Sequence, residues 1–393
     1  MAGILIVVLL LAACSETEEA DPPKENAQGE QGSSGKKDPS NIPSESQPEP
    51  DEPDKIETEI TLSAVGDMLI HKRVYDDARA TKGFDFMPML ENVKPFLGDA
   101  TITFANQETM IGGEKLGLST YPRFNTPQAF GDTLKEVGVD VVSIANNHTL
   151  DRGEEAIQSA IQHWETIDMM YTGAYKDESD SEQLRIMETD AGISIAFLAY
   201  TYGTNGIPTP GGKDYLVNVI DQEAIAKDTA RAKEQADVVV LSLHFGNEYE
   251  RMPSDSQKQL VQFAADQGVD IVLGHHPHVL QPMEWVTGEN GEKTLAVYSL
   301  GNFLSGQYDL YQRIGGIAQM TIKKTVEGEQ ETIEVTNPAF MPTFVKFKND
   351  NDYEVTPMYQ LTEADLAGAE DHYKAIKQHM SQWLPELEFI EGS

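Results

Sequence analysis

Histidines, acids and asparagines gather directly after several apolar runs of this sequence. The residues concerned are Asp67, His71, Asn106, Glu108, Asn147, His148, Asp151, His244, Glu248, His275, His276, His278 and Asn302. Neutral imidazole with carboxylate and amide oxygens is a donor set that suits Zn, Mn, Fe or Co, and a single cysteine excludes Cys-rich zinc modules. The pattern predicts a site for one or two divalent cations.

Taken singly, each of these residues also has an ordinary structural role open to it. Asp67 follows a glycine and can serve a turn, while His148 and His244 can hydrogen-bond inside a core. The run from His275 to His278 differs, because three imidazoles at a buried strand end lower one another's pKa unless a ligand uses their neutral nitrogens. We therefore expect a metal at this run.

Such a donor set predicts hydrolytic chemistry. Two divalent cations about 3.5–4 Å apart can clamp a phosphoryl oxygen and lower the pKa of a water between them. Hydrolysis of a phosphoester or a related bond is the reaction that this implies.

The elements that position these residues are predicted strands buried on both faces, because the preceding runs are apolar and rich in β-branched residues. The expected strands cover residues 60–67, 101–108, 139–148, 193–200, 236–248, 269–278 and 295–303. Helix signals lie between them, including Thr126-Pro127, Glu154-Glu155 and the capping-box spacing of Ser254 and Gln257. Strand and helix alternate, which favours an α/β layered fold with ligands at the carboxyl ends of its strands.

The pattern changes beyond residue 313. Two alternating runs separated by Glu-Gly-Glu predict an antiparallel hairpin. Residues 362–384 predict a terminal helix capped by Thr362 and Asp365.

The N-terminal region carries targeting signals rather than a core. Residues 1–13 are apolar, too few for a membrane-spanning helix of about 20 residues but enough for a signal-peptide core. Leu11-Ala12-Ala13-Cys14 resembles a bacterial lipobox, so we expect Cys14 to be lipidated and to hold the protein outside the cytoplasm on the bacterial cell membrane. A stray cysteine after an ordinary signal or anchor is the alternative. Residues 15–59, rich in Pro, Ser, Gly and Glu, predict a disordered acidic tether.

The charge of the chain limits its partners. Its 29 Lys and Arg residues against 65 Asp and Glu residues give a formal net charge of −36. This charge repels nucleic acid, which is excluded as a default partner, and a polyanionic ligand would need local cations or bound metal. Arg123 and Arg152 can bind phosphate or carboxylate bidentately, or form surface ion pairs.

Six motifs resemble, in order, those of the CapA family of poly-γ-glutamate capsule biosynthesis proteins, a branch of the calcineurin-like metallophosphoesterase superfamily. They are VGDMLIH, FANQE, SIANNHTLDRG, LHFGNEY, GHHPHVLQ and YSLGNF, within residues 60–310. The resemblance implies a four-layer αββα sandwich with the site at one edge of the paired sheets. We accordingly divide the chain into a lipoprotein signal peptide (1–14), a tether (15–59), a CapA metallophosphoesterase-like domain (60–345) and a C-terminal strand and helix packed on it (346–393).

The resemblance also implies a role for each matching residue. The implied metal ligands are Asp67, Asn106, Glu108, Asn147, His244, His276 and His278, and the implied catalytic residues are His148 and Asp151. Residues expected to support the ligands or to contact substrate are His71, Arg123, Glu248, His275 and Asn302. One cation would bind Asp67, His276 and His278. The other would bind Asn147, His244 and either Asn106 or Glu108, because these two residues stand where the superfamily has a bridging aspartate.

The function implied is that of a membrane-anchored extracytoplasmic CapA-type protein that acts in synthesis, transport or anchoring of poly-γ-glutamate. Its expected cofactors are one or two divalent cations (Mn, Zn, Fe or Mg). Its expected partners are an anionic polymer or a phosphorylated small molecule, together with a polymer synthase complex. Two alternatives stay open at this point: an active metal-dependent phosphoesterase on a nucleotide, sugar phosphate or wall polymer, and a non-catalytic scaffold of the synthase complex.

Overall fold

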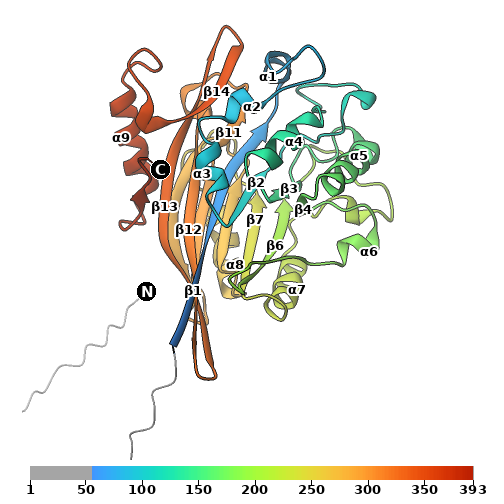
Figure 1. Ribbon diagram of the computed structural model, residues 1–393. Coiled ribbons are helices and arrows are strands. Elements are labelled where there is room, and N and C mark those ends of the chain that lie inside the picture. The colour runs from blue at the N-terminus through green and yellow to red at the C-terminus, as the bar shows by residue number, and fades with distance from the viewer. Residues whose placement is uncertain (1–54, 393) are drawn as a thin grey trace, which may run out of the picture. The chain divides into compact units, whose positions relative to one another are not determined.

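Two β-sheets packed face to face form the centre of the protein in the computed structural model, which describes residues 55–392 (Figure 1). The expected signal peptide, Cys14 and residues 15–54 of the expected tether lie outside the described residues. Among residues 55–392, none of the helices combines the length and the apolar character that a membrane crossing needs.

The first sheet has nine strands within the described residues. Seven follow the order β14-β13-β12-β1-β2-β3-β4, while β11 pairs with β1 and β15 pairs with β13. The strands are β1 (Lys55–Leu69), β2 (Ile102–Asn106), β3 (Val141–Ser143), β4 (Met170–Thr172), β11 (Asn302–Ser305), β12 (Ile314–Glu327), β13 (Gln330–Lys348), β14 (Asn351–Pro357) and β15 (Glu388–Phe389). Strands β1 to β4 run parallel, and β12 and β13 form the antiparallel hairpin that the sequence predicts.

The second sheet has six strands in the order β5-β6-β7-β8-β10-β9. They are β5 (Arg185–Glu188), β6 (Ser194–Thr201), β7 (Val238–His244), β8 (Ile271–His275), β9 (Leu280–Thr287) and β10 (Lys293–Leu300). Strands β6, β7, β8 and β10 are parallel, whereas β5 and β9 are antiparallel edges. In both sheets, therefore, the carboxyl ends of several parallel strands meet at one edge.

Helices cover the outer faces of the two sheets, with one exception (Figure 1). The helices are α1 (Lys72–Asp77), α2 (Met87–Leu90), α3 (Lys94–Gly98), α4 (Ala129–Glu136), α5 (Gly153–Thr166), α6 (Glu178–Ser181), α7 (Gln222–Lys233), α8 (Asp255–Asp266) and α9 (Ala369–Met380). The exception is α9, whose buried Tyr373, Ile376 and Met380 belong to the core between the sheets. Short 3-10 turns occupy Glu114–Leu116, Asp214–Leu216, Leu310–Arg313 and Met358–Gln360.

Three apolar cores separate the layers. Leu62 and Phe104 of the first sheet meet Phe197 and Leu273 of the second, with the rings of Phe104 and Phe197 stacked at 5.9 Å. Helices α4 and α5 bury apolar residues, including Trp164, against the first sheet, and α7 and α8 do the same against the second. The order helix, sheet, sheet, helix is the αββα sandwich that the motifs implied, and its burial of apolar area is the main stabilising term.

The boundaries of two expected segments differ from those in the structure. Strand β1 begins at Lys55, so residues 55–59 of the expected tether are paired with β12, where Lys323 binds Glu57 at 3.0 Å. These residues are mostly exposed, which gives a strand the composition of a linker.

The C-terminal boundary differs too. Strand β13 crosses the expected division at residue 345, and residues 55–392 belong to one compact unit. The expected helix over 362–384 is shorter, because Thr362 and Asp365 cap only a turn and Gly368, with φ 72°, precedes α9.

Candidate metal centre

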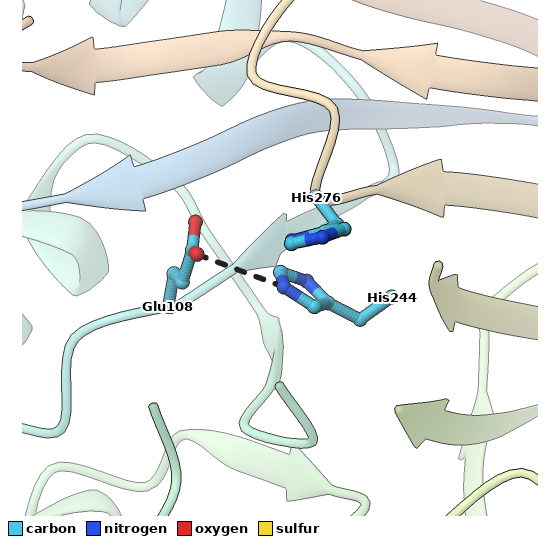
Figure 2. A group of neighbouring side chains, drawn as sticks. All are labelled: Glu108, His244 and His276. Atoms are coloured by element: carbon cyan, nitrogen blue, oxygen red, sulfur yellow. Dashed lines mark ion pairs between the residues drawn. The ribbon is translucent and has the colours of Figure 1, made fainter. Parts of the chain in front are cut away.

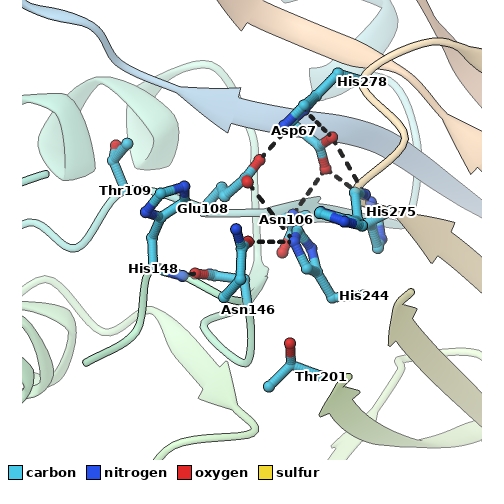
Figure 3. A network of polar contacts seen from close by, with 12 residues as sticks. Asp67, Asn106, Glu108, Thr109, Asn146, His148, Thr201, His244, His275 and His278 are labelled. Atoms are coloured by element: carbon cyan, nitrogen blue, oxygen red, sulfur yellow. Dashed lines mark hydrogen bonds and ion pairs between the residues drawn. The ribbon is translucent and has the colours of Figure 1, made fainter. Parts of the chain in front are cut away.

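The strand ends of both sheets bring the predicted ligands together (Figure 3). Asp67 on β1 is the register partner of Asn106 on β2, and His244 on β7 is the register partner of His275 on β8. All four side chains are fully buried. Residues far apart in the sequence thus meet where parallel strands end, as the sequence predicts.

Asp67 is the hub of this polar network. Its Oδ1 accepts a hydrogen bond from Asn106 Nδ2 at 2.8 Å, and its Oδ2 lies 3.0 Å from Nδ1 of His278. The same His278 nitrogen lies 3.1 Å from Oδ1 of Asn302. Nδ1 of His275 is 3.6 Å from Asp67 Oδ1, so His275 faces the hub without a hydrogen bond.

Glu108 lies between two sets of histidines. Its Oε1 is 3.6 Å from Nε2 of His244 (Figure 2), and its Oε2 is 3.7 Å from Nδ1 of His278 (Figure 3). Three groups have ligand atoms within 4.8 Å of one another: Asp67 with Glu108 and His278, Glu108 with His244 and His276, and Glu248 with His276 and His278. Glu108 is shared by the first two groups, which is the arrangement of a bridging carboxylate.

This grouping differs from the expected one. His276 groups with Glu108 and His244, and also with Glu248 and His278, but not with Asp67. Glu248, expected to support the ligands or to contact substrate, is a candidate ligand. Asn147 does lie beside His244, as expected, with its Oδ1 2.7 Å from Nε2 of that histidine.

Unpartnered polar atoms show that the donor set fits a divalent cation. Both oxygens of Glu108, Oδ1 of Asn106 and Nδ1 of His276 are buried with no hydrogen-bond partner. Buried polar atoms of proteins are nearly always paired, because an unpaired one costs about 1–3 kcal/mol. Oxygen and neutral nitrogen donors left open toward one another are what Zn, Mn or Fe would use.

The protonation states of the histidines agree with this role. Burial, together with the charge of His278, lowers the pKa of His276 to about 3, and burial with the charge of His276 lowers that of His244 well below its usual value. Both imidazoles are therefore neutral near pH 7 and keep a lone pair for a ligand bond.

The acids of the centre, in contrast, favour the protonated, positively charged form of His278. Burial lowers the pKa of His278, but the charges of Glu108 and Asp67 outweigh it and raise that pKa to about 9. Burial raises the pKa of Glu108 well above its usual value, whereas His275 and His278 overcome burial at Asp67 and hold its pKa low. The place between Asp67, Glu108 and His278 thus favours positive charge.

The turn after β8 is conformationally strained. His276 has φ 96° and His278 has φ 59°, in a region that side chains other than glycine rarely adopt. Each such residue costs about 1–3 kcal/mol, and strain of this kind clusters at functional sites. The turn brings His276 near His244 and His278 near Asp67, while both histidines group with Glu248.

His148 and Asp151 form a pair beside these ligands. His148 Nδ1 donates to Asp151 Oδ2 at 2.7 Å, and the same oxygen accepts the Phe124 N–H at 2.7 Å. The pair fixes the imidazole tautomer, which leaves Nε2 free for proton transfer. Both residues line a cavity of about 350 Å³ whose walls also include Asn147 and Glu248.

Two further expected residues support the centre from outside it. Asn302 contacts His278 and donates from Nδ2 to the Gln312 carbonyl at 2.8 Å. His71 is buried against the edge of the Phe124 ring at 5.2 Å and belongs to none of the ligand groups.

Sequence reasoning missed several neighbours of the site. Asn205 accepts from Asn147 Nδ2 at 3.3 Å, and the exposed ring of Tyr202 lies 4.6 Å from that of His276. Asn146 accepts the His148 N–H at 2.9 Å. Asn205 precedes a glycine, a pattern that signals only a turn, whereas Asn146 stands inside a quoted motif and could have been found there.

Comparison with known proteins identifies the family of the chain. Residues 61–307 match the family model of the bacterial capsule synthesis protein PGA_cap. The chain belongs to this family. It is 29% identical over 311 residues to the PGA biosynthesis protein CapA of Bacillus subtilis (strain 168), an alignment that covers 77% of this chain and 78% of that protein.

Two further similar proteins illustrate the range of the matches. The capsule biosynthesis protein CapA of Bacillus anthracis is 29% identical over 257 residues, which are 63% of this chain and 60% of that protein. Among solved structures, the calcineurin-like phosphoesterase YfkN from Bacillus subtilis has a TM-score of 0.39 and 15% identity, and it covers 71% of this chain and 91% of its own.

Proposed function

We propose that this member of the capsule synthesis family is a metal-dependent hydrolase that acts in poly-γ-glutamate synthesis, transport or anchoring. In this proposal it cleaves a bond of an anionic polymer or of a phosphorylated precursor. A lipid on Cys14 holds it outside the cytoplasm. The observation that carries the proposal is the His148–Asp151 pair, which opens into the same cavity as the candidate ligands Asn147 and Glu248. A scaffold would need no oriented imidazole at that place.

The ligand cluster supports a bound metal over a decayed site. Glu108 keeps two buried oxygens without partners, and its charge is costly there unless a cation compensates it. A protein that no longer bound metal would gain stability by replacing such a residue. When bound, a divalent cation polarises a substrate oxygen and lowers the pKa of a water that attacks it.

The chain's own residues supply orientation and proton transfer. Asp151 orients His148, whose Nε2 can hold a proton for a departing oxygen in the cavity. Asn106 holds Asp67 through its hydrogen bond, and Asn302 holds the ring of His278.

The test uses the full-length protein and its gene. We expect purified protein to contain Mn, Zn or Fe and to hydrolyse a generic aryl phosphodiester, and His276→Ala to abolish both metal retention and capsule production. His372→Ala, on α9, is the matched control and keeps both. Metal-free wild-type protein together with normal capsule in the His276→Ala strain would establish the scaffold alternative.

A further inference from the structure

An arginine without an acidic partner lines the cavity beside the candidate metal centre. Arg123 is exposed on the cavity wall, and it has no ion pair or side-chain hydrogen bond to any of residues 55–392. Arg152 differs, because its guanidinium donates to the carbonyls of Leu116 and Gly117. The guanidinium of Arg123 is therefore available to an anion that enters the cavity.

The backbone beneath Arg123 is fixed by its neighbour. The buried ring of Phe124 packs between those of His71 and His148, at 5.2 and 4.7 Å, and its N–H donates to Asp151. The backbone that carries the Arg123 side chain is thus held in place directly beside His148 and Asp151.

The charge of the surroundings makes this cation decisive. The chain carries a net charge of −36, and the cavity wall includes the carboxylates of Asp151 and Glu248. General attraction cannot hold an anionic substrate against such a field, so a local donor must do it. Arg123 is the one arginine or lysine among the described residues that line this cavity.

We propose that Arg123 binds an oxyanion of the substrate, a carboxylate or a phosphate, that is separate from the bond held at the metal centre. The inference rests on the proposed function, because it takes the cavity as the place where substrate lies. It narrows the substrate to molecules with at least two anionic groups close together. A polymer of repeating carboxylates or phosphates meets this condition in every repeat, and an uncharged glycan does not.

Calorimetric titration of the full-length protein tests the assignment. The two probes are a short oligo-γ-glutamate, which offers carboxylates, and a short oligo(glycerol phosphate), which offers phosphates. We expect wild-type protein to bind one of them, Arg123→Ala to weaken that binding by about tenfold or more, and Arg123→Lys to restore part of it. The probe that binds identifies which anion the site takes.

Arg251 provides the matched control. Its guanidinium lies 3.9 Å from the ring centroid of Tyr311, it forms no ion pair within residues 55–392, and it is not on the wall of the cavity. Arg251→Ala should bind the probe as wild type does. An equal loss in both variants would reveal a general charge effect and overturn the proposal.

Two other results would also overturn it: unchanged affinity in Arg123→Ala, or no binding of either probe by the wild-type protein. Neither result bears on the metal-dependent function, because metal content and capsule production test that function separately.

Discussion

Asn106 donates a hydrogen bond from Nδ2 to Oδ1 of Asp67 across the neighbouring strands β1 and β2, at 2.8 Å. An ionised aspartate at position 106 could make no such bond. The neutral amide therefore holds Asp67 in place and leaves the bridging charge to Glu108, two residues farther along the chain. Substitutions of Asn106 and of Glu108 can test these two roles separately.

Replacement of Asn106 by Asp should make the metal-free protein less stable. It would remove the hydrogen bond and bring a second buried carboxylate against Asp67, at a cost of about 2 kcal/mol or more. Added Mn²⁺ or Zn²⁺ should then raise the melting temperature of Asn106→Asp by more than that of wild type. Asn290→Asp, in an exposed turn, is the control. Equal metal effects in all three proteins would contradict the arrangement.

Glu108→Gln should have opposite effects on stability and on metal binding. Burial raises the pKa of Glu108, so the charged carboxylate is costly in the metal-free protein and its neutral replacement should stabilise that state by about 1–3 kcal/mol. The same change removes the shared ligand and should sharply reduce metal content. Chemical denaturation with chelator present, together with elemental analysis, measures both. A variant that is destabilised without metal would disprove the reasoning.

Much of the centre could be predicted from sequence, and the part that could not depends on backbone geometry. Asp67, His244 and His278 end or follow apolar runs, so their convergence follows from parallel strands. The way in which the ligands are shared between groups could not be predicted in this way, because the pattern His-x-His suggests one metal for both rings. His276 and His278 have positive φ angles, and their ring centroids lie 5.8 Å apart. Both rings group with Glu248, but only His276 also groups with His244 and only His278 also groups with Asp67.

Some of the fold was hidden for a similar reason. Ser254 and Gln257 form the predicted capping box, since that signal is local and complete within four residues. The exposed start of β1 reads as a linker, because its partner strand β12 lies more than 250 residues away in the sequence. Residues 55–59 form a strand only through their pairing with β12.

His71 should make the metal-free protein sensitive to acid. Burial lowers the pKa of His71 to about 4, below its usual value near 6.5. Because the folded state binds the proton less readily than the unfolded state, this contribution is fully present above about pH 6.5 and is lost as the pH falls toward 4. The loss amounts to about 3 kcal/mol.

Urea denaturation across that pH window, with chelator present, would measure the effect. His71→Gln should show a shallower decline in the free energy of unfolding than wild type, whereas His372→Gln on α9 should follow wild type. Parallel declines in His71→Gln and wild type would mean that His71 is protonated as easily in the folded protein as in the unfolded one.

Cys14→Ser tests the proposed lipid anchor, which lies outside the described residues. Without a thiol to carry a diacylglyceryl group, the variant should move from the membrane fraction to the soluble extracytoplasmic fraction or the medium. Ser15→Ala, at the neighbouring position, is the control and should stay with the membrane. Unchanged fractionation of Cys14→Ser would refute lipidation at this residue.

Asp151→Asn should separate proton transfer from metal binding. A neutral amide at this position accepts the Nδ1–H of His148 more weakly and loses the negative charge that stabilises a protonated imidazole, so hydrolysis of an aryl phosphodiester should fall by about 10²–10⁴-fold while metal content stays the same. Asp132→Asn is a matched control, because Asp132 also contacts a histidine, Nε2 of His163 at 3.0 Å, but on the surface. Loss of metal together with activity would instead make Asp151 a support of the ligand cluster, and equal activity in both variants would remove His148 from the reaction.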